Sequence, residues 1–307
     1  MTIEDYNPNI NRPPTNRAII LKNTNCAYCG VDLNSLSLTK EHVIGRRFVP
    51  KGKLDKQWNL ILNACSSCNN IKSDLEDDLS AITMPPDGYG QHSVNDPALF
   101  TQAKKKAQRS KSRRTNKFIA DSKEQITVDF DVSPSVNMKI FFSSPPQASP
   151  ERIYRLAEFH LKGFFYLITY NNKSNKGGFW NGQFSPVMYS NRADWGNPVQ
   201  MAFMRTIKDW PLRIHAIGAG EFFKISIRRH PSADCWGWAL EWNQSYRVIG
   251  LFGDPEATEL VLDTFPALSF SGLPSNDAEI PVYRIRQEVP LNESDDLLFK
   301  WHDPQQA

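Results

Sequence analysis

The sequence has few cysteines, no long apolar run and no compositional bias. Its 307 residues include 5 Cys, and 40% are hydrophobic and 22% charged. These fractions are those of an ordinary globular protein, and they exclude intrinsic disorder, a collagen repeat and a small disulfide-stapled scaffold. Because no run of about 20 apolar residues occurs, no membrane-spanning helix is predicted.

The N-terminal residues also lack the features of a secretory signal. Residues 1–16 are polar and rich in Pro and Asn, without a basic stretch followed by an apolar one. We therefore expect a cytoplasmic location. In reducing cytoplasm, paired cysteines are more often metal ligands than disulfides.

A strong net charge is absent as well, but the total of +3 hides a gradient. Residues 1–117 hold 18 Lys and Arg against 11 Asp and Glu, a net +7. Residues 118–307 hold 18 against 22, a net −4. A basic first third favours a polyanionic partner, whereas the acidic remainder argues against nucleic acid coating the whole surface.

Composition shifts divide the chain into four parts. We expect a flexible leader over residues 1–16, a first domain over 17–95, a basic helix or linker over 96–119 and an α+β domain over 120–307. Pro85-Pro86 ends the helix of the first domain, residues 87–95 are expected to form a loop, and Asp96-Pro97 starts the next helix.

The pattern of residues 120–307 predicts an α+β domain with an antiparallel sheet. Residues 126–132 and 138–142 alternate as strands do, and helices are expected from Ser149-Pro150 to Ile168 and from Asn197-Pro198 to Trp210. Four strand-like runs follow, and their short connections indicate an antiparallel meander. These runs are Leu212–Ile217, Phe222–Arg228, Trp236–Trp242 and Tyr246–Phe252.

Four of the five cysteines form two CxxC pairs, Cys26/Cys29 and Cys65/Cys68, with 35 residues between the pairs. Two such pairs supply the four thiolates of a tetrahedral zinc site. Because four protein ligands leave no open position, this zinc is expected to be structural. Cys235 stands alone and is expected to be a small buried apolar residue.

Polar residues that could take part in catalysis or metal binding lie between and after the cysteine pairs. Glu41-His42 comes first, Asn59 precedes the apolar run Leu60–Leu62, and Cys68-Asn69 is followed by Lys72-Ser73. This order resembles the HNH endonucleases of the ββα-metal type, in their His-Asn-Asn variant. The resemblance covers residues 24–80, about a fifth of the chain.

The resemblance implies a zinc-stapled finger and a metal-dependent DNA endonuclease. His42 would end the first strand and act as general base, because an imidazole takes a proton from water near neutral pH. Asn59 would orient the ring. Since Asn59 is one residue further from Cys65 than is common in the family, Asn63 is an alternative orienting residue.

The resemblance also implies a catalytic cation and phosphate contacts. Glu41 and Asn69 would hold Mg²⁺ or another divalent cation, and Lys72 would point at the same phosphate. Neighbouring phosphates of duplex DNA would be held by a set of basic residues. This set comprises Arg46, Arg47, Lys104, Lys105, Lys106, Arg109, Lys111, Arg113 and Arg114. Such enzymes act in restriction, phage defence and mobile-element biology.

Two alternatives stay open. The first domain is either this nuclease or a non-catalytic zinc-containing nucleic-acid-binding module. Residues 120–307 either recognise an activating ligand or protein partner or serve as a scaffold. The tryptophans of 236–242 share one strand face and are expected in the core; if exposed, they would stack bases. The remaining histidines are expected to be structural or solvated, and Asp74, Glu76, Asp77 and Asp78 to form a solvated helix face.

Overall fold

The computed structural model describes residues 16–33, 38–85, 96–133, 136–274 and 282–300. The expected leader, up to residue 15, and the expected loop over 87–95 lie outside the described residues. Helices and antiparallel sheets are mixed along the chain, as expected for an α+β protein.

The N-terminal part is a small sheet followed directly by a helix. β2 (Leu38–His42) pairs antiparallel with β3 (Leu60–Cys65), and β1 (Ile19–Ile20) pairs parallel with the other edge of β3. α1 (Ser66–Thr83) begins at the residue after β3 and ends shortly before Pro85. We call β1, β2, β3 and α1 with their connections the finger. Its last three elements, β2, β3 and α1, follow the order strand–strand–helix expected from sequence, and β1 adds a short third strand.

A five-stranded antiparallel sheet forms the centre of the molecule. Its strand order is β6-β10-β9-β8-β7. The bounds are β6 Gln183–Asn191, β7 Leu212–Gly218, β8 Phe223–Arg229, β9 Cys235–Trp242 and β10 Tyr246–Gly253. Strands β7 to β10 confirm the predicted antiparallel meander. β6 was not predicted, because Pro186 interrupts its pattern; the strand tolerates it at a register shift opposite Ile249 and Gly250 on β10.

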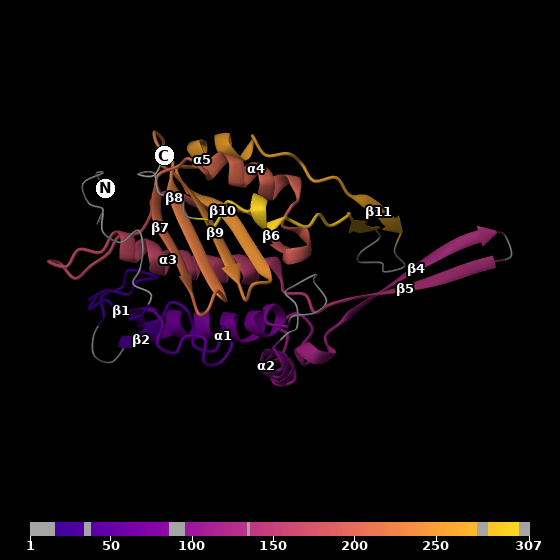
Figure 1. Cartoon of the computed structure of the whole chain (residues 1–307), viewed down its shortest axis with the longest axis horizontal. Helices are drawn as coiled ribbons and strands as arrows, with labels where there is room; N and C mark the ends of the chain where they lie inside the picture. Colours follow the sequence, from indigo (N-terminus) through magenta and orange to yellow (C-terminus); the bar gives the residue numbers. More distant parts are fainter. Residues whose placement is uncertain (1–15, 34–37, 86–95, 134–135, 275–281, 301–307) are drawn as a thin grey trace.

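Helices cover both faces of this sheet (Figure 1). α3 (Pro150–Ile168) lies between the sheet and the finger, while α4 (Pro198–Ile207) and α5 (Pro255–Leu262) cover the opposite face. Each helix begins with proline in its first turn, and the Asn197 side chain caps α4 by accepting from Gln200 N. The sheet is therefore the middle of three layers.

The tryptophans of β9 lie on the face toward α3. Trp236, Trp238 and Trp242 are at most 2% exposed and belong to the same hydrophobic cluster as α3 and the finger. The expected core position is confirmed, and base stacking by this face is excluded. Cys235 is also buried, among residues of the α4 side.

The remaining elements lie around these layers. α2 (Pro97–Ala107) starts at Asp96, whose side chain accepts from Ala98 N and Leu99 N, and η3 (Ile119–Asp121) follows. β4 (Glu124–Ser133) and β5 (Val136–Ser144) form a hairpin that projects from the body (Figure 1). β11 (Ser271–Pro274) pairs with β12 (Val282–Ile285), and η4 (Arg192–Asp194) and η5 (Glu293–Asp295) are short turns.

Packing is continuous across the boundary expected between the first and last domains. One hydrophobic cluster runs from Leu21 and Trp58 of the finger through α3 to Phe252 of β10. Gly163 lets α3 approach the finger closely, because a Cβ there would lie 2.8 Å from Val43 Cγ2. The finger and the sheet therefore share a core, a feature that the charge gradient did not predict.

Candidate metal centre and finger site

The four paired cysteines converge at one end of the finger. Cys26 and Cys29 lie in the turn before β2, Cys65 ends β3, and Cys68 is in the first turn of α1. Their sulfur atoms all lie within 4.8 Å of one another. Gly30, with φ 78°, supplies the turn after Cys29, and its N–H donates to Cys26 O.

The donor set fits a metal ion such as zinc. A tetrahedral site with zinc–sulfur bonds of about 2.3 Å places its sulfurs about 3.8 Å apart. The Cys29 and Cys65 sulfurs are 3.8 Å apart. Among the described residues, these cysteines form the only group of three or more His, Cys, Asp or Glu side chains spaced to hold a metal.

His42 is the last residue of β2, the position expected from sequence. Its side chain is half-buried, and its Nε2 is enclosed without a hydrogen-bond partner. Burial, together with the charges of Arg46 and Lys72, lowers the pKa of His42 below its usual 6.5. The ring is therefore neutral at pH 7, and its Nε2 is shielded from solvent.

Lys72 lies in the interior rather than toward a phosphate. Its side chain is fully buried, and its Nζ lies 2.7 Å from Glu41 Oε1 and 2.5 Å from Glu76 Oε1. Nζ also donates to the His42 carbonyl at 3.2 Å. Burial opposes the charge on Lys72, but the carboxylates of Glu76 and Glu41 outweigh it and raise the pKa. The Lys72 ammonium is therefore fixed next to the last two residues of β2 by Glu41, Glu76 and the His42 carbonyl.

The Glu41 carboxylate is therefore already paired with Lys72. It is 7% exposed, and burial raises its pKa although Lys72 opposes that shift. Asn69 is half-buried in the first turn of α1. In this arrangement Glu41 and Asn69 do not form a ready-made divalent-cation site, because the Lys72 ammonium already neutralises the carboxylate.

Asn59 holds the backbone that follows His42 rather than being paired to its ring. Its Nδ2 donates to Ile44 O at 2.8 Å, and its Oδ1 accepts from Ile44 N at 3.3 Å. Asn63, the alternative, is bound to Asn23 through both its backbone N–H and its Nδ2. The structure thus links Asn59, and not Asn63, to the segment next to His42.

A largely buried acid and a buried histidine complete this network; the sequence placed Glu76 on a solvated face and gave His160 no part in the site. Glu76 Oε1 accepts from Gly45 N at 3.2 Å and lies 3.7 Å from Nε2 of His160, a fully buried residue of α3. A Cβ at Gly45 would lie 2.1 Å from Glu76 Oε2, so a larger residue there would displace the Glu76 carboxylate. The structural role expected for His160 is confirmed.

Only two of the four acidic residues of α1 are solvated as expected: the side chains of Asp74 and Asp77 are 49% and 46% exposed, whereas those of Glu76 and Asp78 are 13% and 2% exposed. Asp78 is 2% exposed and paired with Arg152 of α3 at 2.7 Å. Asp74 lies 3.0 Å from Arg152 Nη1 and 2.8 Å from Arg113 Nη2, and Asp77 also contacts Arg113. The expectation was wrong for Glu76 and Asp78, because Lys72 and Arg152 pair with these two carboxylates.

The basic residues expected to bind phosphates divide into two groups. Arg113 is engaged by α1, and Lys106 Nζ donates to Arg47 O, with burial lowering its pKa to about 8. The other seven are exposed. These are Arg46, Arg47, Lys104, Lys105, Arg109, Lys111 and Arg114.

Comparison with protein-family models finds no match. Comparisons with curated proteins and with solved structures find none either. No described helix combines the length and apolarity needed to cross a membrane. The functional assignment therefore depends on the finger's own residues.

Proposed function

We propose that the protein is a metal-dependent DNA endonuclease of the HNH type with His42 as general base. The observation that carries the proposal is the unpaired, enclosed Nε2 of a neutral His42 at the end of β2. A buried polar atom without a partner is costly, and such atoms concentrate where a reacting group or water is to be bound.

The groups around His42 support a role in proton transfer. A neutral imidazole removes a proton from an attacking water; of the charges that act on His42, Glu76 favours the imidazolium formed, whereas Arg46 and Lys72 oppose it. Asn59 fixes the segment beginning at Ile44, and the Lys72 ammonium fixes the His42 carbonyl. These two contacts fix the backbone from the His42 carbonyl to Ile44.

The proposed substrate is duplex DNA. Arg46 and Arg47 follow His42 within five residues and are exposed, and Lys104 and Lys105 are exposed on the last turns of α2. Exposed cations of this kind bind phosphates and release counterions, so binding would weaken as salt increases. Restriction, phage defence or mobile-element biology is the proposed context.

A divalent cation, Mg²⁺ or another, remains part of the proposal, with Glu41 and Asn69 as its ligands. Such an ion would neutralise charge on the phosphate. Because Lys72 occupies Glu41 Oε1, the cation has to displace that ammonium. The same contact favours a second candidate function, a zinc-containing nucleic-acid-binding protein in which Lys72 has replaced the catalytic cation.

A plasmid-cleavage assay separates the two functions. Wild type, His42→Ala and Lys40→Ala, an exposed control on the same strand, are compared in Mg²⁺, Mn²⁺ and Ni²⁺ after DNA binding has been measured for each. We expect His42→Ala to lose roughly 100-fold or more in cleavage rate and Lys40→Ala to stay within a few-fold. Because the pKa of His42 is lowered, the rate should rise to its plateau at a lower pH than it would with an imidazole of ordinary pKa.

Equal nicking by wild type and His42→Ala would refute His42 as the base. Salt-dependent DNA binding without cleavage in any of the three metals would support the non-catalytic alternative.

A further inference from the structure

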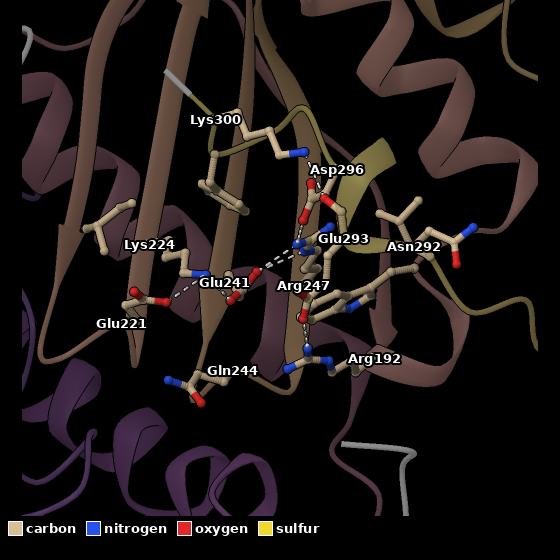
Figure 2. A pocket seen from close by; sticks show the side chains of 14 residues that line it. Arg192, Glu221, Lys224, Glu241, Gln244, Arg247, Asn292, Glu293, Asp296 and Lys300 are labelled. Carbon is tan, nitrogen blue, oxygen red and sulfur yellow. Dashed lines mark hydrogen bonds and ion pairs between the residues drawn. The ribbon is translucent and has the colours of Figure 1, made fainter. Parts of the chain in front are cut away.

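A polar pocket lies on the face of the central sheet opposite the finger. Its volume is about 410 Å³, within the range of small-molecule sites. Strands β8, β9 and β10 supply Lys224, Glu241 and Arg247, and the C-terminal residues 291–300 form the opposite wall (Figure 2). We call it the Arg247 pocket.

Arg247 is buried and held in one orientation. Its Nε and Nη2 lie 3.0 and 2.8 Å from Glu241 Oε2, and Nη2 also donates to Asp296. Its guanidinium lies 3.7 Å from the centre of the Trp195 ring. The carboxylates thus occupy Nε and Nη2 of the guanidinium, and Trp195 covers one of its faces. Nη1 is enclosed and has no hydrogen-bond partner.

The acids of the pocket are already neutralised. Glu241 also binds Lys224 at 3.0 Å, and at the rim Glu293 pairs with Arg192 and Glu221 lies 3.8 Å from Lys224. The group that stays without a hydrogen-bond partner is the Nη1 donor of the Arg247 guanidinium. Leaving such a group buried costs on the order of 1–3 kcal/mol or more, and an oxygen acceptor removes that cost.

We propose that the Arg247 pocket binds the oxyanion of a small molecule, a phosphate or carboxylate group that accepts from Arg247 Nη1 after displacing the atoms that enclose this nitrogen. The remaining volume accommodates a ligand of nucleotide size. Lys300, whose Nζ donates to Glu293 O and Ser294 O, holds the C-terminal wall in place over it.

Ligand binding is transmitted to the finger by two turns. The β7–β8 turn is flanked by the pocket residues Ile217 and Glu221, and Ile217 O accepts from Trp58 Nε1 at 2.8 Å. The β9–β10 turn contains the pocket residue Gln244, and next to it Asn243 Nδ2 donates to Phe48 O at 3.2 Å. Both turns therefore contact the pocket and the segments that flank the finger site.

Binding is tested on the full chain by calorimetric titration with inorganic phosphate, adenosine and guanosine monophosphates, and citrate. We expect at least one probe to bind, and Arg247→Lys to weaken it at least tenfold, because an ammonium cannot keep both the fork to Glu241 and the Nη1 contact. Arg228→Lys, on β8 but outside the pocket, should bind within twofold of wild type. Binding only of phosphates or only of citrate identifies the source of the oxyanion.

A second variant covers misfolding of Arg247→Lys. Gln244→Glu adds a negative charge at the rim and should also weaken binding several-fold. Absence of binding by every probe, or undiminished binding by the folded variants, would overturn the proposal and leave a water-filled pocket.

Transmission is tested by hydrogen exchange with and without the bound probe. We expect slower exchange of amides in residues 43–58 as well as in the two turns. Protection confined to the pocket would overturn the transmission. Neither readout depends on nuclease activity, so these results stand apart from the fate of the proposed function.

Discussion

At the scale of single residues, the centre of the finger is a buried cation between two acids. Lys72 connects Glu41 of β2 and Glu76 of α1 with the carbonyl of His42. The CxxC pairs and the position of His42 followed from local spacing. The burial of Lys72 did not, because it depends on Glu41, 31 residues earlier in sequence, and on α3 closing the site above Glu76.

Replacing this cation should be costly. Lys72→Met leaves Glu41 and Glu76 buried without a counter-charge, and we expect a loss of about 3–5 kcal/mol in the free energy of unfolding. Lys40→Met on the exposed face of β2 should change it by less than about 0.5 kcal/mol. Urea denaturation at pH 7 measures both, and a loss under 1 kcal/mol for Lys72→Met would show that the network does not stabilise the fold.

His160 predicts an acid dependence of stability. Burial lowers its pKa to about 4 from 6.5, although the adjacent carboxylate of Glu76 opposes this shift. Between pH 6.5 and 4 the unfolded chain binds the extra proton, so the free energy of unfolding falls as pH falls, by roughly 2–3 kcal/mol. Burial raises the pKa of Glu76, but Lys72 and His160 bring it below 4.5, so its own loss of stability begins near that pH.

His160→Phe tests this dependence. Phenylalanine keeps the ring contacts with Phe48, Phe223 and Trp242 and removes the titration. Denaturation at pH 7.5 and at pH 5 should show a smaller loss of stability in the variant than in wild type. The same loss in both would contradict the assignment to His160.

At the scale of elements, helix starts were predictable and edge elements were not. Asp96-Pro97 and Asn197-Pro198 begin helices as their capping patterns indicate. Asp254-Pro255 carries the same signal for α5, where the Asp254 side chain accepts from Ala257 N, so this helix was available to sequence reasoning and was overlooked. β6 was not, because its pairing with β10 is a tertiary contact that compensates for Pro186.

Helix α3 depends on a glycine where it meets the finger. In an exposed helix Gly→Ala stabilises by about 1 kcal/mol, but at Gly163 the new Cβ would lie 2.8 and 2.9 Å from the two methyls of Val43. We expect Gly163→Ala to destabilise by about 1–3 kcal/mol. Because Val43→Ala removes those methyls, the double variant should lose at least 1 kcal/mol less than the sum of the single losses. Additive losses in thermal or urea unfolding would place the strain elsewhere.

At the scale of the whole molecule, the finger and the sheet are joined more tightly than sequence suggests. Composition separated a basic N-terminal part from an acidic remainder, which favoured two domains joined by a linker. Instead, the linker residue Arg113 pairs with Asp74 and Asp77 of α1. Arg152, which belongs to α3, pairs with Asp78 of α1. Opposite charges thus pair both within the basic part, between Arg113 and α1, and across the boundary, between α1 and Arg152; net charge by segment cannot show such pairing.

The shared core predicts how loss of the metal spreads. Sequence alone predicts that removing zinc from the four cysteines unfolds residues 24–80. Because Trp58 of the finger packs on Phe164 of α3 and donates to Ile217 O of β7, the finger cannot unfold without exposing the face of the sheet that holds Trp236, Trp238 and Trp242.

We therefore expect chelation, or Cys26→Ser, to lower the unfolding temperature of the whole chain in one transition. Far-ultraviolet circular dichroism and tryptophan fluorescence should change together, and Cys235→Ser, outside the metal centre, should respond to chelator as wild type does. An early transition without a change in tryptophan fluorescence would show that the finger unfolds independently, as the division at residues 96–119 implies.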